Sequence, residues 1–144
     1  MEEILTDKDK DVLGPTQFST IIKRVKYLDD SINDLEKIID RFSHDNREYI
    51  QDSLDRLYAR SMINIIKILD TKPFSSTLES FVYLSDLEYL EKSLYRSAKI
   101  YEKYENEIDN GYVYKYIIKR IGRIRINIFK LMVSVVEKRF NRML

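Results

Sequence analysis

Residues 21–42 read IIKRVKYLDDSINDLEKIIDRF. Apolar side chains recur in this stretch at alternating steps of three and four residues, at Val25, Leu28, Ile32, Leu35, Ile39 and Phe42. Such a repeat places one apolar seam along one side of an α-helix. Gly14 and Pro15 precede the stretch, and proline is tolerated in the first turn of a helix. The pattern therefore predicts a helix over residues 16–41.

A second helix is predicted over residues 46–69, after a turn at residues 43–46 that is rich in polar side chains. Its expected apolar face consists of Ile50, Leu54, Leu57, Tyr58, Met62, Ile65, Ile66 and Leu69. Because only a short turn separates the two helices, we expect them to pack as an antiparallel hairpin.

Residues 70–78 interrupt the helical pattern, since Pro73 disfavours helix in the residue before it and the hydroxyl-rich sequence suits a loop. A third helix is predicted from Leu78 or Ser85 to Ile108, and Asp109-Asn110-Gly111 supplies a typical helix end. Its expected inward side chains are Leu87, Leu90, Leu94, Ala98, Tyr101 and Ile108.

A fourth helix is predicted from Tyr112 to the C-terminus, and it carries two adjacent apolar stripes. The first consists of Ile117, Ile121, Ile124, Ile128, Leu131 and Val135. The second consists of Ile118, Phe129, Met132, Val136 and Phe140. So broad an apolar surface predicts contact with more than one neighbour. Gly122 interrupts a helix interior, which predicts close approach of another helix.

These patterns predict an all-α protein of four main helices, packed as a bundle or as two antiparallel helical hairpins. The expected layout is a single domain, 1–144, with an acidic N-terminal tail (1–15), a first hairpin (16–69), a loop (70–78) and a second hairpin (79–144). Residues 60–69 align with residues 123–132, with five of ten residues identical, so an internal duplication is an alternative to chance similarity.

The composition argues against an enzyme. The 144 residues contain no cysteine, three glycines and one histidine, His44, which lies in a predicted turn. These residues supply no thiolate chemistry, no histidine pair and no glycine-rich phosphate loop, so we expect no catalytic residue, no metal site and no cofactor. No apolar run is long enough to span a membrane, and the N-terminus is acidic, so a cytoplasmic protein without membrane contact or small-molecule substrate is expected.

A row of basic residues in the last predicted helix is one candidate site. Between residues 110 and 144 there are nine lysines and arginines and a single acid, Glu137. The candidates for phosphate contact are Lys115, Lys119, Arg120, Arg123, Arg125 and Lys130. Such a row can bind a polyanion with strong salt dependence. The alternative is that these cations pair with acids of the preceding helix and keep the surface soluble.

The chain contains 11 tyrosines and no tryptophan. Tyrosine is favoured at protein interfaces because its ring is apolar and its tip is polar. Five tyrosines recur along more than one face of the third predicted helix, which predicts that some of them contact another chain: Tyr83, Tyr89, Tyr95, Tyr101 and Tyr104.

The stretches IIKRVKYLDDSINDLEKI (21–38) and REYIQDSLDRLYARSMINIIKIL (47–69) resemble the helical domain of subunits of the GINS complex. The resembling positions of the second stretch are Tyr49, Tyr58, Arg60, Lys67 and Ile68. Residues 83–108 are similar to the helix that follows in that family. The resemblance implies an assembly subunit of an archaeal-type DNA-replication complex.

Two functional hypotheses follow. The first is a non-catalytic interaction or scaffold subunit that binds protein partners or a second copy of itself. The alternative is a nucleic-acid-binding helical protein that uses the basic residues of its last helix, for example a small subunit of a nucleic-acid-guided complex.

Overall fold

The computed structural model describes residues 12–42, 47–107 and 112–144. They form four long helices: α2 (Pro15–Phe42), α3 (Arg47–Thr71), α4 (Leu84–Glu107) and α5 (Tyr112–Met143). Two short 3-10 turns, η2 (Ser76–Leu78) and η3 (Phe81–Tyr83), connect α3 to α4. The described residues contain no strand, only one isolated β-bridge. The prediction of an all-α protein with four main helices is confirmed.

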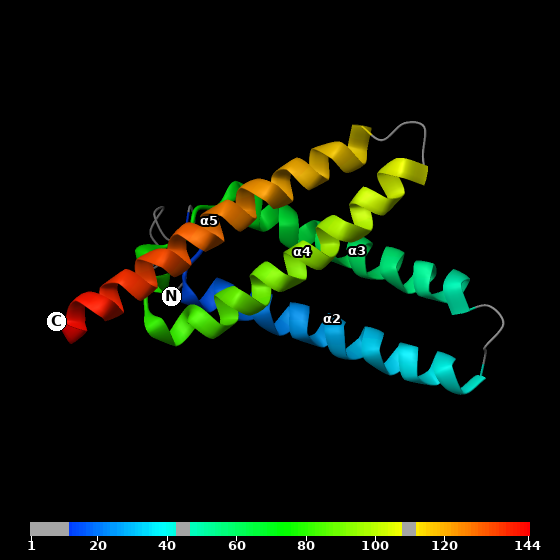
Figure 1. Cartoon of the computed structure of the whole chain (residues 1–144), viewed down its shortest axis with the longest axis horizontal. Helices are drawn as coiled ribbons and strands as arrows, with labels where there is room; N and C mark the ends of the chain where they lie inside the picture. Colours follow the sequence, from blue (N-terminus) through cyan, green and yellow to red (C-terminus); the bar gives the residue numbers. More distant parts are fainter. Residues whose placement is uncertain (1–11, 43–46, 108–111) are drawn as a thin grey trace, which may run out of the picture.

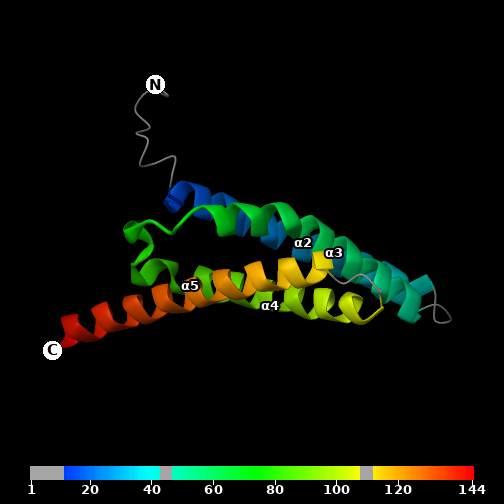
Figure 2. The same cartoon turned by 90° about the horizontal axis from the view of Figure 1, so that it is seen from above.

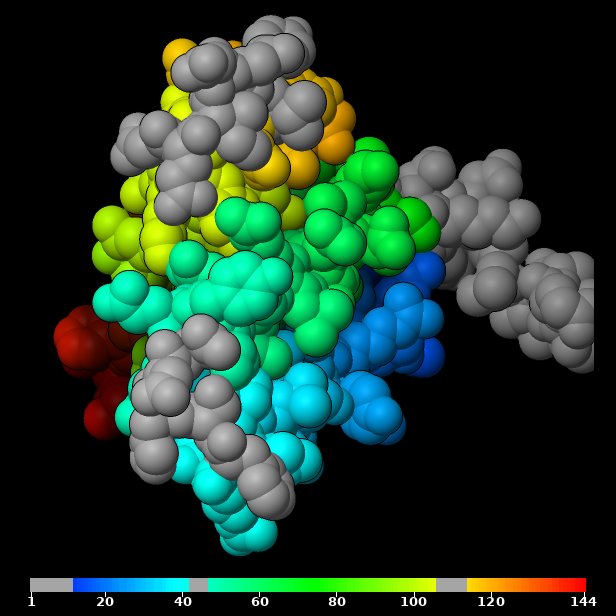
Figure 3. Space-filling view, turned by 90° about the vertical axis from the view of Figure 1, so that its right-hand side faces the viewer, coloured from blue at the N-terminus to red at the C-terminus, as the bar shows by residue number. Residues whose placement is uncertain are grey.

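The four helices form two hairpins in two layers. Helix α2 packs on α3, and α4 packs on α5. Figures 1 and 2 show that the α4–α5 hairpin lies across one face of the α2–α3 hairpin. Helix α3 contacts both α4 and α5, and Figure 3 shows it between α2 and the second hairpin. The second of the two predicted architectures, packed antiparallel hairpins, describes this arrangement.

One hydrophobic cluster joins the two layers and receives side chains from all four helices. The predicted inward residues of α4 from Leu87 to Tyr101 are buried, as is the first stripe of α5 from Ile121 to Val135. The seam of α2 is only partly inward, since Val25 and Ile32 are buried whereas Leu35 is exposed. The predicted inward residue Ile108 lies outside the described residues.

The chain segment before α2 is tied to the segment after α3. The amide of Leu13 donates to the Pro73 carbonyl at 2.8 Å, and the amide of Ser75 donates to the Leu13 carbonyl at 2.9 Å. Leu13 is fully buried. Residues 12–15 therefore belong to the packed fold, although they were expected to be part of a tail, and residues 1–11 lie outside the described residues.

The explanation predicted for Gly122 is wrong. Apart from the local backbone of α5, no heavy atom of the described residues lies within 4 Å of the position that a Cβ atom would occupy there. Close approach of another helix does not account for this glycine. The aligned segments 60–69 and 123–132 both lie in the second helix of their hairpin.

Candidate interaction surfaces

The basic residues of α5 are divided between two sides of the helix. Arg120 and Arg123 both pair with Asp70 of α3, whereas Arg125 pairs with Glu91 of α4 at 2.6 Å. Lys115 pairs with Glu105 of α4 at 3.7 Å. Lys119 and Lys130 have no ion pair with any described residue. Four of the six predicted phosphate-binding residues are thus paired with acids of the chain itself.

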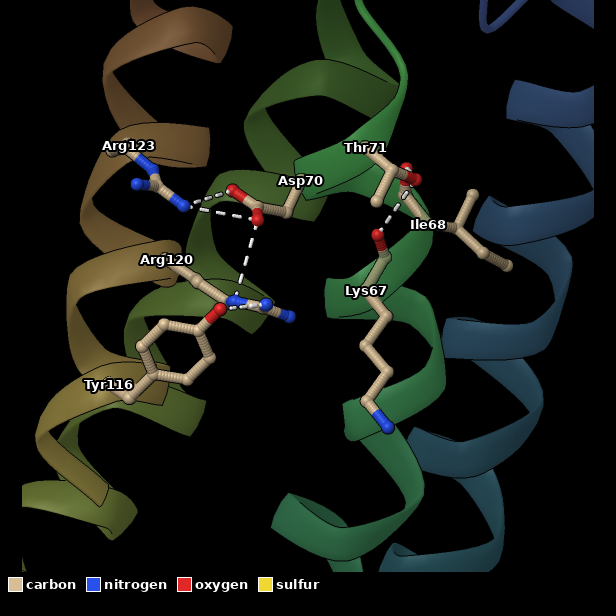
Figure 4. Close-up of polar contacts among 7 residues, drawn as sticks. All are labelled: Lys67, Ile68, Asp70, Thr71, Tyr116, Arg120 and Arg123. Carbon is tan, nitrogen blue, oxygen red and sulfur yellow. Dashed lines mark hydrogen bonds and ion pairs between the residues drawn. The ribbon is translucent and has the colours of Figure 1, made fainter. Parts of the chain in front are cut away.

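Asp70 is the centre of the α3–α5 contact (Figure 4). Its side chain is only 12% exposed, and its oxygens accept two hydrogen bonds from Arg123 Nη2, at 2.9 and 3.1 Å. Arg120 Nε lies 3.5 Å from the carboxylate, and the Arg120 guanidinium stacks 4.1 Å from the centre of the Tyr116 ring. A carboxylate near a helix C-terminus is unfavourable by itself, so the two arginines compensate for both its burial and its position.

We predict that Asp70→Asn lowers the free energy of unfolding by about 2 kcal/mol, because it leaves the largely buried Arg120 cation without a counter-charge. Urea denaturation followed by circular dichroism measures the change. Asp34→Asn is the matched control, since Asp34 is exposed on α2 and should change stability by no more than about 0.5 kcal/mol. Equal losses in the two variants would contradict a stabilising role for the Asp70 pairs.

Two of the five predicted interface tyrosines are buried in the chain's own core. The Tyr101 hydroxyl donates to the Ala59 carbonyl at 2.8 Å, and the Tyr104 hydroxyl donates to the Asp52 carbonyl at 3.2 Å. Both rings pack against Tyr114, with centroid distances of 5.7 and 5.9 Å. Burial raises the pKa of Tyr101 to about 12. These two tyrosines join α4 to α3 and are not available to another chain.

The other three predicted interface tyrosines, one in η3 and two in α4, differ in exposure. Tyr83 is half-buried against Phe18, and Tyr89 is half-buried with its hydroxyl donating to Asp29 of α2. Tyr95 is 45% exposed, and the Arg125 guanidinium lies over its ring. Of the five predicted interface tyrosines, only Tyr95 is an exposed residue.

A polar cluster joins α2, α3 and α4 near Tyr89. Arg96 lies 3.8 Å from Asp29 and 4.1 Å from the centre of the Tyr58 ring. Burial raises the pKa of Tyr58 to about 12, and burial together with the Asp29 hydrogen bond raises that of Tyr89. Like an unperturbed tyrosine, both phenols are neutral at physiological pH, so their hydroxyls act as hydrogen-bond donors that help to position the helices.

Helix α5 carries an exposed apolar row that the sequence prediction did not distinguish from its core-facing residues. Its members follow steps of three and four residues, and we call them the outer seam: Ile126, Phe129, Val133, Val136, Phe140 and Met143. Every member is exposed, from 39% for Val133 to 77% for Met143. The second predicted stripe mixed these positions with Ile118 and Met132, which pack against the core.

The outer seam and the buried face lie on different sides of α5. At 100° per residue, their centres are separated by roughly 130° around the helix axis. Figures 1 and 2 also show the C-terminal end of α5 projecting beyond the other helices. Residues 136–144 are all exposed. This part of the helix is therefore largely exposed, and its contacts with the segment before α4 are the Lys138–Glu79 ion pair and the Arg139 guanidinium over the Phe81 ring.

A second apolar surface is a groove between α2 and α3, with a volume of about 750 Å³. Its apolar lining includes Leu28 and Leu35 of α2 and Leu57 of α3, and Lys23 and Arg24 also contribute to its wall. Leu57 was predicted to face the core and is instead 44% exposed in this groove.

Two absences concern only the described part of the chain. No group of three or more potential ligand residues there could hold a metal ion. None of the described helices combines the length and apolar character needed to cross a membrane. His44 lies in residues 43–46, outside the described ranges.

No family model, curated protein or solved structure matches this chain. The fold and its surfaces define an all-α protein of two stacked helical hairpins, with an exposed apolar seam on its last helix.

Proposed function

We propose that this protein is a non-catalytic interaction or scaffold subunit of a macromolecular assembly, and that α5 is its principal binding element. The outer seam is the observation that carries the proposal. Large contiguous apolar surfaces are uncommon on proteins that act alone and are typical of binding sites. Since α5 already has a complete buried face, the outer seam is not needed to hold the chain's own helices together.

The resemblance of residues 21–68 to GINS subunits supports a DNA-replication complex as the setting for this role. Of the resembling residues, Tyr49 and Arg60 are exposed, whereas Tyr58 is buried and contributes to the core. The proposal of a DNA-replication complex therefore rests on the sequence resemblance, whereas the proposal of a binding role rests on the exposed outer seam.

The nucleic-acid-binding alternative has weaker support. Phosphate contact by Arg120, Arg123 or Arg125 would compete with ion pairs that these residues form with Asp70 and Glu91. Only Lys119 and Lys130 of the six candidates are without such pairs among the described residues. A titration with single- and double-stranded DNA and RNA at about 50 and 200 mM salt distinguishes the alternatives, because phosphate binding weakens steeply with salt.

Site-specific photocrosslinking in cells tests the proposed function. Benzoylphenylalanine placed at Phe129 should form covalent products with another polypeptide chain, because this position lies in the outer seam. The same group at Tyr49, which is 76% exposed on α3, is the matched control and should form few products. Equal yields at the two positions, or none at either, would contradict the proposal that α5 is the binding element.

A further inference from the structure

We propose that the outer seam binds the outer seam of a second copy of this chain, with the two α5 helices antiparallel. The inference rests on the proposed function, because both assign binding to the same face of α5. It adds the identity of the partner and the direction in which the partner's helix runs.

The spacing of the outer seam is that of a coiled-coil interface. Its residues alternate between the two heptad positions, a and d, that form the contact in paired helices. The sequence of steps is also the same when read in either direction from the midpoint between Ser134 and Val135. In an antiparallel pair each a residue therefore faces a d residue throughout. Ile126 faces Met143 of the second copy, and Val133 faces Val136 of the second copy.

The charges beside the outer seam favour the antiparallel direction. Lys130 and Glu137 occupy successive e positions, and antiparallel pairing brings e positions of the two helices together. Lys130 of each copy then lies opposite Glu137 of the other. Neither residue has an ion pair with any described residue of its own chain. The only acid of residues 110–144 is thus placed where the antiparallel pair requires a negative charge.

Parallel pairing would place like charges together. In a parallel pair, g positions of one helix face the following e positions of the other. Arg125 would then lie opposite Lys130 of the second copy, at two symmetric places in the interface. Arg125 is also held toward α4 by its pair with Glu91. The charge pattern therefore distinguishes the two directions.

The outer seam has about the area that a dimer needs. Buried aromatic side chains contribute about 150–250 Å² each, and the outer seam contains two phenylalanines and four aliphatic or thioether side chains, all partly exposed, so it offers on the order of 700 Å². A standard interface buries about 800 Å² on each partner. Because α5 is already packed against the core from Ile121 to Val135, pairing does not have to offset the free-energy cost of forming that part of the helix.

Analytical ultracentrifugation of the purified full chain tests the inference. We expect a reversible change from 17.3 kDa to twice that mass as the concentration rises from about 1 to 100 μM. Val136→Glu should abolish the dimer and leave the helical circular dichroism unchanged, because Val136 is exposed in the monomer. Asn127→Glu is the matched control on a different side of α5 and should dimerise normally. A dimer that survives Val136→Glu would overturn the proposal, as would a wild-type monomer at about 100 μM.

Charge exchange tests the direction of the helices. Lys130→Glu and Glu137→Lys should each weaken the dimer by about tenfold, and the double exchange should restore it. In a parallel dimer Lys130→Glu would instead strengthen association, because it would remove the repulsion by Arg125. Tighter binding by this variant would overturn the antiparallel arrangement.

Disulfide trapping gives an independent measure of direction, since the native chain has no cysteine. A mixture of the Val133→Cys and Val136→Cys proteins should form mixed disulfides, and neither protein alone should form a disulfide-linked dimer efficiently. The opposite pattern indicates a parallel pair. Open-ended oligomers would indicate that the seam enters the α2–α3 groove of the next molecule, because such head-to-tail contacts need not close. Either result overturns the inference.

The outcomes also separate this inference from the proposed function. If the purified chain stays monomeric while position 129 crosslinks a different polypeptide, self-pairing is wrong and the binding role of α5 stands. If neither dimer nor crosslink forms, both proposals fail.

Discussion

Tyr101→Ala should lower the free energy of unfolding by about 4 kcal/mol, because it removes a large buried side chain and leaves a cavity between α3 and α4. Tyr101 is 3% exposed, packs against Tyr114 and donates a hydrogen bond to the Ala59 carbonyl. Domains of this size have total stabilities of about 5–15 kcal/mol. The variant should therefore show a much lower urea midpoint at a protein concentration equal to that of the wild type.

Two controls separate the contributions of Tyr101. Tyr101→Phe keeps the ring and should cost only about 1 kcal/mol, the typical net value of one hydrogen bond. Tyr49→Ala removes an equal side chain from a position that is 76% exposed and should change stability by at most about 0.5 kcal/mol. If Tyr101→Ala were as mild as Tyr49→Ala, Tyr101 would not be a core residue.

Phe18→Ala should also lower the free energy of unfolding by about 4 kcal/mol. Phe18 is fully buried at the start of α2, with ring centroids 6.5 Å from Phe74 and 6.0 Å from Tyr83. These edge-to-face contacts connect α2 to the segment that follows α3 and to the turn that precedes α4. The loss should loosen all three segments.

Hydrogen exchange and urea denaturation together measure the effect of Phe18→Ala. The Leu13 and Ser75 amides, which hydrogen-bond across the β-bridge, should exchange faster than in the wild type. Tyr27→Ala is the control on the same helix, because Tyr27 is 76% exposed, and it should leave both measurements nearly unchanged. Unchanged exchange at Leu13 in the Phe18 variant would contradict the proposed connection.

The helix boundaries were largely predictable because local signals set them. The first helix was predicted over residues 16–41 and spans Pro15–Phe42, beginning at the proline that suits a first turn. The second was predicted to end at Leu69 and continues to Thr71, just before the residue that precedes Pro73. For the third helix, Leu78 and Ser85 were both plausible starts, and it begins at Leu84. Tyr83 packs against the distant Phe18, a contact that local sequence does not reveal.

Whether a predicted site residue is exposed or already engaged within the chain depends on contacts between distant parts of the sequence. Arg120 and Arg123 are separated from Asp70 by 50 and 53 residues, respectively, and no local pattern indicates that α3 and α5 bring them together. Likewise, the hydroxyl of Tyr101 reaches a carbonyl 42 residues away. The composition suggested more tyrosines than one core can bury. The core nevertheless contains Tyr58, Tyr101 and Tyr104, because each hydroxyl donates a hydrogen bond to a backbone carbonyl.

The sequence by itself determined that the chain is helical, where most helices begin and end, and that α5 is apolar on more than one side. Only the tertiary structure decided which side of α5 is covered. The physical reason is that helical periodicity specifies the angle of each side chain around its own axis, but not the direction from which a neighbouring helix approaches. Packing on α3 and α4 buries Ile121, Ile124 and Ile128, and leaves Phe129 and Phe140 exposed.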